Sequence, residues 1–179
     1  MKFSEKWLRT WVDPKIGTDE LCDQLTSAGL EADAVGSVAD EFTGVVIGEI
    51  LELHAHPNAD RLSVCTVFDG SEKFSVVCGA PNARVGLKTA FARVGSELSD
   101  GLEIQRTKLR GVQSYGMLCS AKELGMSDDH DGIMELSNTL SPGLELREAL
   151  DLDEFSIDLD LTPNRGDCFS VRGVAREVA

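Results

Sequence analysis

Long apolar segments and a secretion signal are absent from this chain of 179 residues. No apolar run approaches the ~20 residues that a bilayer requires. The first residues, MKFSEKWLRTWV, are too charged for a signal peptide. We therefore expect a cytoplasmic protein with no membrane partner.

Paired cysteine motifs are also absent. The five cysteines are odd in number and widely spaced, and no CxxC pair occurs. This pattern excludes a zinc ribbon and a thioredoxin-like redox site. We expect reduced, mostly buried thiols.

Catalytic sequence motifs are missing as well. The chain has no GxSxG, no phosphate-binding P-loop and no GxGxxG followed by an acidic residue, and no nucleophile stands beside a base. We therefore predict no catalytic residue, no metal site and no cofactor in this chain.

Positive charge is scarce, with 17 Lys and Arg against 31 Asp and Glu, a net charge of −14. An acidic chain usually repels nucleic acid, because phosphate neutralisation supplies most non-specific affinity. The distribution is uneven, however. Residues 84–110 hold six basic residues against three acidic ones, a local charge of +3, so any contact with RNA is expected there.

Two amphipathic helices are predicted at the start of the chain. Ser4 can cap the first and Thr18 the second, and Gly29 is a natural C-terminal stop. The residues expected on the buried face of the first helix are Trp7, Leu8, Trp11 and Val12, and those of the second are Leu21, Cys22, Leu25 and Ala28. A half-exposed strand is expected at 30–38.

From residue 42 the apolar period changes to two, which is typical of strands. The sequence predicts five of them, at 42–53, 61–70, 73–80, 87–95 and near 114–120, the last followed by a helical turn at KELG. Gly44 and Gly48 inside the first strand indicate bulges or tight bends. Five short strands of similar spacing predict a small closed barrel, with the oligonucleotide-binding (OB) fold as the leading candidate.

The two ends of the chain are expected to fold together. A strand at 155–161, with Ile157, Leu159 and Leu161 inward, precedes a last helix that begins near Asp167. Segments 1–39 and 152–179 each have too little apolar surface to fold alone. We predict an α+β protein in which these segments form one split domain and residues 40–151 form an inserted five-stranded OB-fold barrel. Because the last helix has no capping residue before Ala179, we expect a piece of a longer chain.

The segment HPNADRL, residues 56–62, allows three interpretations. His54 and His56 are two apart and could form half of a metal site, but zinc needs three or four ligands and no third lies nearby in sequence. Proline, asparagine and aspartate also build turns. The segment is therefore interpreted as a structured loop, with a ligand-contacting loop as the alternative.

Two acidic segments resemble cation sites. In SDDHDG, residues 127–132, the first and twelfth positions of a calcium loop would be Ser127 and Asn138, so two of the main ligands are wrong. In DLDEFSIDLDL, Asp158 and Asp160 alternate with apolar residues, as on an exposed strand face. Both segments are interpreted as solvated surface.

The segment KLRGVQSYGMLCS, residues 108–120, is a candidate phosphate-binding loop. Lys108, Arg110 and the later Lys122 bracket a run that contains Gly111 and Gly116. Basic residues on a loop can meet phosphates, while glycines let another backbone approach closely. A solvated charged turn is the alternative.

Several ungapped motifs in order resemble the N-terminal part of the β subunit of bacterial phenylalanyl-tRNA synthetase, and the resemblance covers the whole chain. The motifs are MKFSEKWLRTWV (1–12), AGLEADAV (28–35), HPNADRL (56–62), VCGAPN (77–82), KLRGVQSYGMLCS (108–120), ELGMSDDHDGI (123–133) and TPNRGDCFSVRGVAREVA (162–179).

This resemblance implies a split N-terminal domain with an inserted OB barrel of the tRNA-binding type. It also implies a heterotetramer of two α and two β subunits that uses ATP and magnesium to attach phenylalanine to its tRNA, with the catalytic site on the α subunit. HPNADRL is then the loop between the first two barrel strands. Pro57 and Asn58 are expected to shape this loop, and Asp60 and Arg61 to fasten it.

Two functional hypotheses remain open. The first is an accessory tRNA-binding module, and the second is a purely structural module for subunit packing. Residues 40–151 hold ten Lys and Arg against eighteen Asp and Glu, a net charge of −8, which favours weak over autonomous RNA binding. The residues predicted to contact RNA are Arg84, Lys88, Arg93, Lys108, Arg110 and Lys122.

Overall fold

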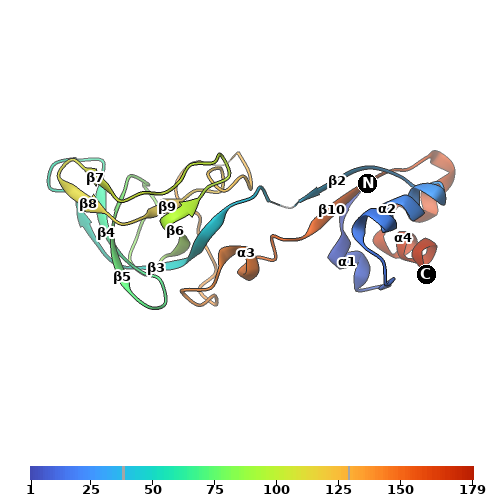
Figure 1. Ribbon diagram of the computed structural model, residues 1–179, viewed down its shortest axis with the longest axis horizontal. Helices are drawn as coiled ribbons and strands as arrows, with labels where there is room; N and C mark the ends of the chain where they lie inside the picture. The colour runs from blue at the N-terminus through green and yellow to red at the C-terminus, as the bar shows by residue number, and fades with distance from the viewer. Residues whose placement is uncertain (38, 129) are drawn as a thin grey trace. The chain divides into compact units, whose positions relative to one another are not determined.

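The computed structural model describes residues 1–37, 39–128 and 130–179 (Figure 1). The chain forms two compact units. Unit 1 comprises Met1–Val38 and Asp153–Ala179, and unit 2 comprises Ala39–Leu152.

Unit 1 is a three-stranded antiparallel sheet with helices. The strand order is β1-β10-β2, with bounds Lys2–Ser4, Phe155–Asp160 and Glu31–Ser37. Its helices are α1 (Glu5–Arg9), α2 (Thr18–Ser27), the 3₁₀ helix η1 (Pro163–Cys168) and α4 (Val171–Val178). The central strand β10 belongs to the second segment of the unit, Asp153–Ala179. It pairs with β1 on one side and with β2 on the other. Both segments contribute to one core, which includes Leu8, Leu21, Leu25, Leu30, Ile157, Leu159 and Val174.

The first helix is shorter than the sequence predicts. Ser4 caps it as expected, accepting a 2.9 Å hydrogen bond from the Trp7 N–H. The helix ends at Arg9, so the predicted four-residue face does not continue. Leu8 is buried, but Trp7 and Trp11 are each 55% exposed, which makes the prediction of a buried tryptophan face wrong.

The second and last helices begin differently from the prediction. Gly17, not Thr18, is the N-cap of α2, because the Thr18 hydroxyl donates instead to Glu5 Oε2 at 2.8 Å. Helix α4 begins at Val171 rather than near Asp167. Ser170 caps it by accepting a 3.1 Å hydrogen bond from the Gly173 N–H.

Unit 2 is built on a curled five-stranded antiparallel sheet, a half-barrel of the OB type. Its order is β5-β4-β3-β6-β9. The bounds are Lys73–Cys78, Ser63–Phe68, Thr43–Ala55, Lys88–Glu97 and Met117–Cys119. A separate hairpin pairs β7 (Thr107–Leu109) with β8 (Val112–Ser114), and the short helix α3 spans Leu146–Ala149. The predicted strands are thus confirmed, and the expected bulge lies at Gly44, where the β3–β6 register shifts.

The central strand β3 is buried on both faces because successive side chains point to opposite sides. Val46 and Ile50 enter one core with Val67, Val76 and Phe91. Val45 and Ile47 enter a second core with Leu124 and Leu146, where the segment after β9 covers the sheet.

The segment between β8 and β9 links the two edge strands of the half-barrel. Tyr115 N–H donates to Ser75 O at 2.9 Å, and the Ser114 hydroxyl accepts a 3.0 Å bond from Val77 N–H. All five cysteines are buried and free, as predicted. No helix in the described ranges is long and apolar enough to cross a membrane.

Candidate nucleic-acid interface

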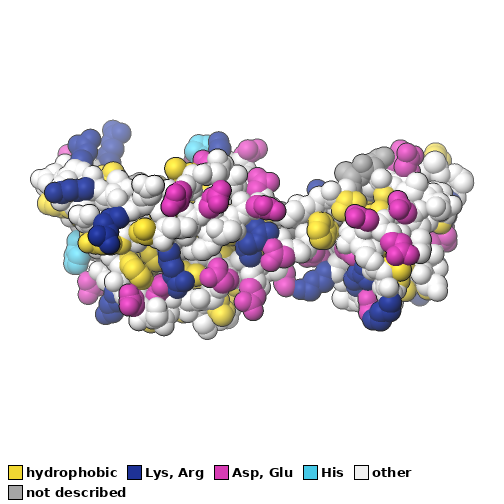
Figure 2. Space-filling model, viewed as in Figure 1, with side chains coloured by type: hydrophobic (Ala, Val, Ile, Leu, Met, Phe, Trp, Pro, Cys, Tyr) yellow, Lys and Arg dark blue, Asp and Glu magenta, His cyan; other side chains and the backbone are white. Residues whose placement is uncertain are grey.

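The β7–β8 hairpin presents two of the predicted cations. Arg110 and Gly111 form its two-residue turn, with φ of 44° and 98°. Positive φ at both positions is the type I′ conformation that suits the twist of a hairpin, and glycine adopts it without strain. Lys108 lies on β7 and Arg110 at the tip, and both side chains are exposed. In Figure 2, dark-blue side chains gather at the end of unit 2 that holds β7 and β8 in Figure 1.

The HPNADRL loop holds this hairpin in place. His56 is only 5% exposed, and its Nε2 lies 3.1 Å from Leu109 O, while its Nδ1 accepts a 3.1 Å bond from Asn58 N–H. These partners require the neutral tautomer with the proton on Nε2. Asn58 Nδ2 then donates to Arg110 O at 3.0 Å. One loop thus bonds to the last residue of β7 and to the turn itself.

This arrangement agrees with the interpretation of the segment as a structured loop and corrects one expectation about which residues fasten it. His54 is 73% exposed and lies 3.9 Å from Glu52, whereas His56 is buried with both ring nitrogens engaged, so the two do not form half of a metal site. The hairpin is fastened by His56 and Asn58. Asp60 and Arg61, which were expected to fasten the loop itself, make no side-chain hydrogen bond within the described ranges.

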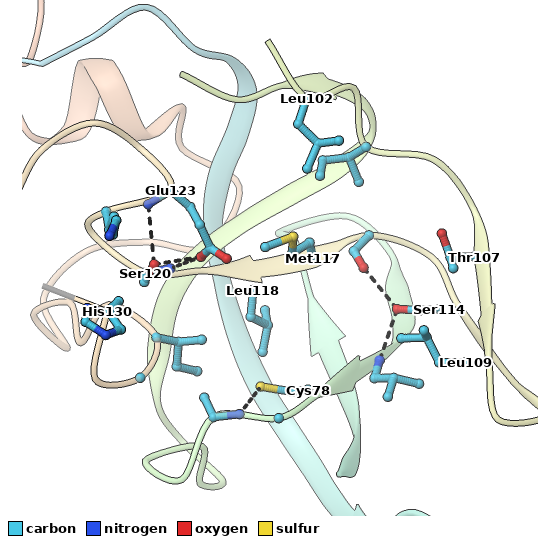
Figure 3. Close-up of a pocket in the computed structure, with 18 of the residues that line it drawn as sticks. Cys78, Leu102, Thr107, Leu109, Ser114, Met117, Leu118, Ser120, Glu123 and His130 are labelled. Atoms are coloured by element: carbon cyan, nitrogen blue, oxygen red, sulfur yellow. Dashed lines mark hydrogen bonds between the residues drawn. The ribbon is translucent and has the colours of Figure 1, made fainter. Parts of the chain in front are cut away.

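A groove of about 1040 Å³ opens between the hairpin, the end of β5 and strand β9 (Figure 3). Its apolar wall includes Leu102, Leu109, Met117, Leu118 and Ile133, and its polar groups include Ser120, Lys122, Glu123 and His130. Glu123 Oε2 accepts bonds from the Ser120 N–H and hydroxyl at 2.6 and 2.7 Å, which fixes the carboxylate at one side. Lys122, exposed beside it, is the third predicted cation at this site.

The other three predicted cations have partners within the chain. Arg84 forms a two-pronged pair with Glu135, with both N–O distances 2.7 Å. Hydrogen bonds from Arg84 and, to a smaller extent, from Asn82 lower the pKa of Glu135 to about 2. Lys88 Nζ donates to the carbonyl oxygens of Asn138 and Leu140. These side chains therefore fasten the segment that covers the sheet.

Arg93 pairs with a buried carboxylate. Its Nη2 lies 2.6 Å from Asp69 Oδ2, and the Asp69 side chain is 3% exposed. Burial acts to raise the pKa of Asp69, but bonds from the Glu72 and Ser71 N–H groups, the Ser71 hydroxyl and Arg93 outweigh it and lower that pKa to about 2. Removing Arg93 would leave a buried charge with less compensation, so this residue stabilises the fold.

One feature of the hairpin was not predicted. The Arg106 guanidinium lies 4.8 Å from the centre of the Tyr115 ring, a cation–π contact that joins the loop before β7 to the linker after β8. Arg106 belongs to the basic stretch in the sequence, but its partner is nine residues away, and only the folded hairpin brings them together.

A cluster in unit 1 has the composition of a metal site. Ligand atoms of Asp167, Cys168 and Glu177 all lie within 4.8 Å of one another. Arg165 occupies this cluster, with Nη2 3.0 Å from Glu177 Oε2 and 3.1 Å from Cys168 Sγ. The cluster is therefore a salt-bridge network, and within the described ranges no other group of three such residues meets the same criterion.

The half-barrel and its edge hairpin define a tRNA-binding domain of the OB type. The family described as "Putative tRNA binding domain" matches residues 45–145, more than half of the chain, and the chain belongs to this family.

The chain is also similar to known synthetase subunits. The phenylalanine–tRNA ligase β subunit of Pseudomonas putida is 54% identical over 179 residues, covering 100% of this chain and 23% of that protein. The β subunit of Hahella chejuensis is 53% identical, with 100% and 23% covered, and that of Bordetella bronchiseptica is 56% identical, with 100% and 22% covered. The chain thus spans less than a quarter of the length of these relatives.

Proposed function

We propose that unit 2 contacts phenylalanine tRNA as an accessory module of a phenylalanine–tRNA ligase β subunit. The observation that carries this proposal is a hairpin with exposed cations, Lys108 and Arg110, hydrogen-bonded to His56 and Asn58 at the edge of a tRNA-binding-family sheet. Phosphate contacts from such side chains position an RNA without reading its sequence. Lys122 at the groove would add a third contact.

The wider role follows from the relatives. As part of a β subunit, the chain would belong to a complex with an α subunit, two copies of each, that uses ATP and magnesium to charge phenylalanine tRNA. The chain itself contributes no nucleophile or phosphate-cradling motif. We expect the isolated chain to show no ATP–pyrophosphate exchange, and exchange by the pure chain would contradict this assignment.

We further propose that unit 1 is one discontinuous domain into which unit 2 is inserted. Its support is the central position of β10, which pairs with β1 on one side and β2 on the other.

The RNA contact is tested by a salt series of tRNA binding. K108A/R110A should bind more weakly, and its slope of log affinity against log salt should be flatter by about 1.4–1.8, for two lost phosphate contacts. The charge-matched control is K15A/K73A, because Lys15 belongs to unit 1 and Lys73 lies at the opposite end of β5 from the groove-lining Cys78. Equal affinities for the two variants would reject the contact.

A purely structural role is the second candidate, and the net charge of −8 in residues 40–151 is the observation that favours it. Long-range repulsion of a polyanion opposes RNA binding by such a module. Absence of salt-dependent tRNA binding by the parent chain, even at low salt, would select this role.

A further inference from the structure

A second groove lies in unit 1 and is unrelated to the hairpin. Its volume is about 300 Å³, and residues of β1, α1 and the start of α4 line it. The residues that matter here are Phe3, Trp7, Trp11 and Val171, which make it apolar, and Lys2 and Arg172, which make it basic.

The two indole rings are accessible. Trp7 and Trp11 are each 55% exposed, although most of the other large apolar side chains of this unit are buried. Tryptophan rings offer flat faces on which nucleobases stack, with an energy that does not depend strongly on the base. The rings therefore provide a platform for a flat aromatic ligand.

The charge of the groove opposes that of the surrounding unit. Unit 1 holds seven Lys and Arg (17 less the ten of unit 2) against thirteen Asp and Glu (31 less eighteen). Two of those seven cations line the groove, and none of its lining residues, all of them described, is acidic. Asp158 lies opposite Lys2 in the sheet, but its carboxylate pairs with the amino terminus of Met1 at 3.1 Å. The groove thus favours an anionic ligand.

Size distinguishes a nucleotide from a polypeptide partner. A volume of about 300 Å³ is at the lower limit of small-ligand sites. It accommodates one base with its sugar, whereas a partner helix is ~10 Å across and needs a longer groove. We propose that this groove binds one unpaired nucleotide of an RNA, with the base stacked on Trp7 or Trp11 and the phosphate against Lys2 and Arg172.

The site can be weak and still contribute. This inference rests on the proposed function only for the class of ligand. An RNA held by unit 2 is at a raised effective concentration around unit 1, because one chain joins the two units. A stacking contact with one base then adds to the total affinity without binding RNA tightly by itself.

The chain offers a selective reporter for this test. It contains two tryptophans, and both line the groove, so tryptophan emission reports only on this site. Titration with a short single-stranded oligoadenylate at low salt should quench the emission in a saturable way. The affinity should fall about fivefold or more in one of two variants, W7A followed through Trp11 or W11A followed through Trp7, namely the one that lacks the ring on which the base stacks.

Paired variants separate this site from the hairpin. K2A/R172A should weaken the quenching severalfold, whereas K15A should not, since Lys15 is an exposed cation of the same unit outside the groove. K108A/R110A should leave the quenching unchanged. Melting curves of each variant show whether it remains folded.

The outcomes are distinct. Quenching with the same affinity in K2A/R172A and in K15A would overturn the inference. So would binding of labelled oligoadenylate with unchanged tryptophan emission, a result that leaves the hairpin proposal intact. Absence of any quenching at saturating oligoadenylate would also overturn the inference, and it too would leave the hairpin proposal intact.

Discussion

At the scale of single residues, Gly173 is the clearest case of a residue whose type is required by the close packing of its neighbours. A Cβ at this position would lie 2.0 Å from Asp167 O and 2.9 Å from Cys168 Cα, both backbone atoms that cannot move aside easily. Gly173→Ala should therefore destabilise unit 1 by about 1–3 kcal/mol or more, the cost of overpacking. Urea unfolding measures the change.

Gly17 provides the control. It has an ordinary φ of −76°, and a Cβ there would meet nothing within 4 Å. Gly17→Ala should cost no more than about 1 kcal/mol, because alanine is only a poorer N-cap than glycine and no overpacking arises. If the two substitutions cost the same, the close packing of α4 against η1 is not what requires glycine at 173.

Asp69 makes a pH-dependent contribution to the stability of unit 2. Its folded-state pKa, about 2, lies below the ordinary value of 3.8, because the bonds to its carboxylate outweigh burial. The stabilisation is therefore present above pH ~4 and is lost as the pH falls toward 2. The parent should lose stability more steeply than Asp69→Asn across this window.

Denaturant unfolding at several pH values measures that difference. Asn keeps the size of Asp69 but carries no charge to titrate. Glu135→Gln is the matched comparison. The pKa of Glu135 is also about 2. Unlike Asp69, however, Glu135 has a side chain that is 48% exposed, and its pair with Arg84 is solvated. An equal loss of stability at low pH in the parent and in Asp69→Asn would contradict the assignment of this pH dependence to Asp69.

At the scale of elements, the hairpin depends on the loop beside it. Asn58→Ala removes the bond to Arg110 O at the turn. We expect a stability loss of about 1 kcal/mol, the typical value for one hydrogen bond, together with faster amide exchange in residues 107–114. The tRNA affinity should fall because the cations are then less well positioned.

The salt dependence separates this positioning effect from a lost phosphate contact. Asn58→Ala leaves Lys108 and Arg110 in the chain, so the salt slope should stay close to that of the parent while the affinity drops. A slope as flat as that of K108A/R110A would show that the loop does more than position the hairpin.

At the scale of the whole molecule, the two units should differ in their response to truncation. Removing residues 153–179 deletes β10 and α4, which leaves β1 and β2 without a shared partner and exposes Leu21 and Leu25. The remaining residues of unit 1 should lose amide protection. Unit 2 should keep its protection, because its cores involve no residue of unit 1.

Hydrogen exchange followed by mass spectrometry tests both halves of this prediction at once. Unit 2 peptides serve as the internal control for folding of the truncated chain. Protected amides in residues 5–27 of the truncated chain would contradict the proposal of a discontinuous domain.

The sequence by itself determined where the strands of unit 2 lie and that both segments of unit 1 contain helices. Alternating apolar residues and interior glycines depend on the local chain, so the period-two pattern of β3 to β6 and the bulge at Gly44 were predictable. Ser4 as a cap was predictable for the same reason, since capping acts over three residues.

Only the tertiary structure decided which polar residues remain available. Residue type does not distinguish the paired cations Arg84, Lys88 and Arg93 from the exposed Lys108 and Arg110. The partners of the three paired cations lie 24–52 positions away in sequence. The spacing of Trp7 and Trp11 fits one face of a helix, but the helix ends at Arg9, before Trp11, and both rings are exposed. HPNADRL has the composition of a turn, yet its histidine and asparagine fasten a hairpin 52–53 residues further on. Such contacts depend on chain segments that meet only after folding, and no local pattern encodes them.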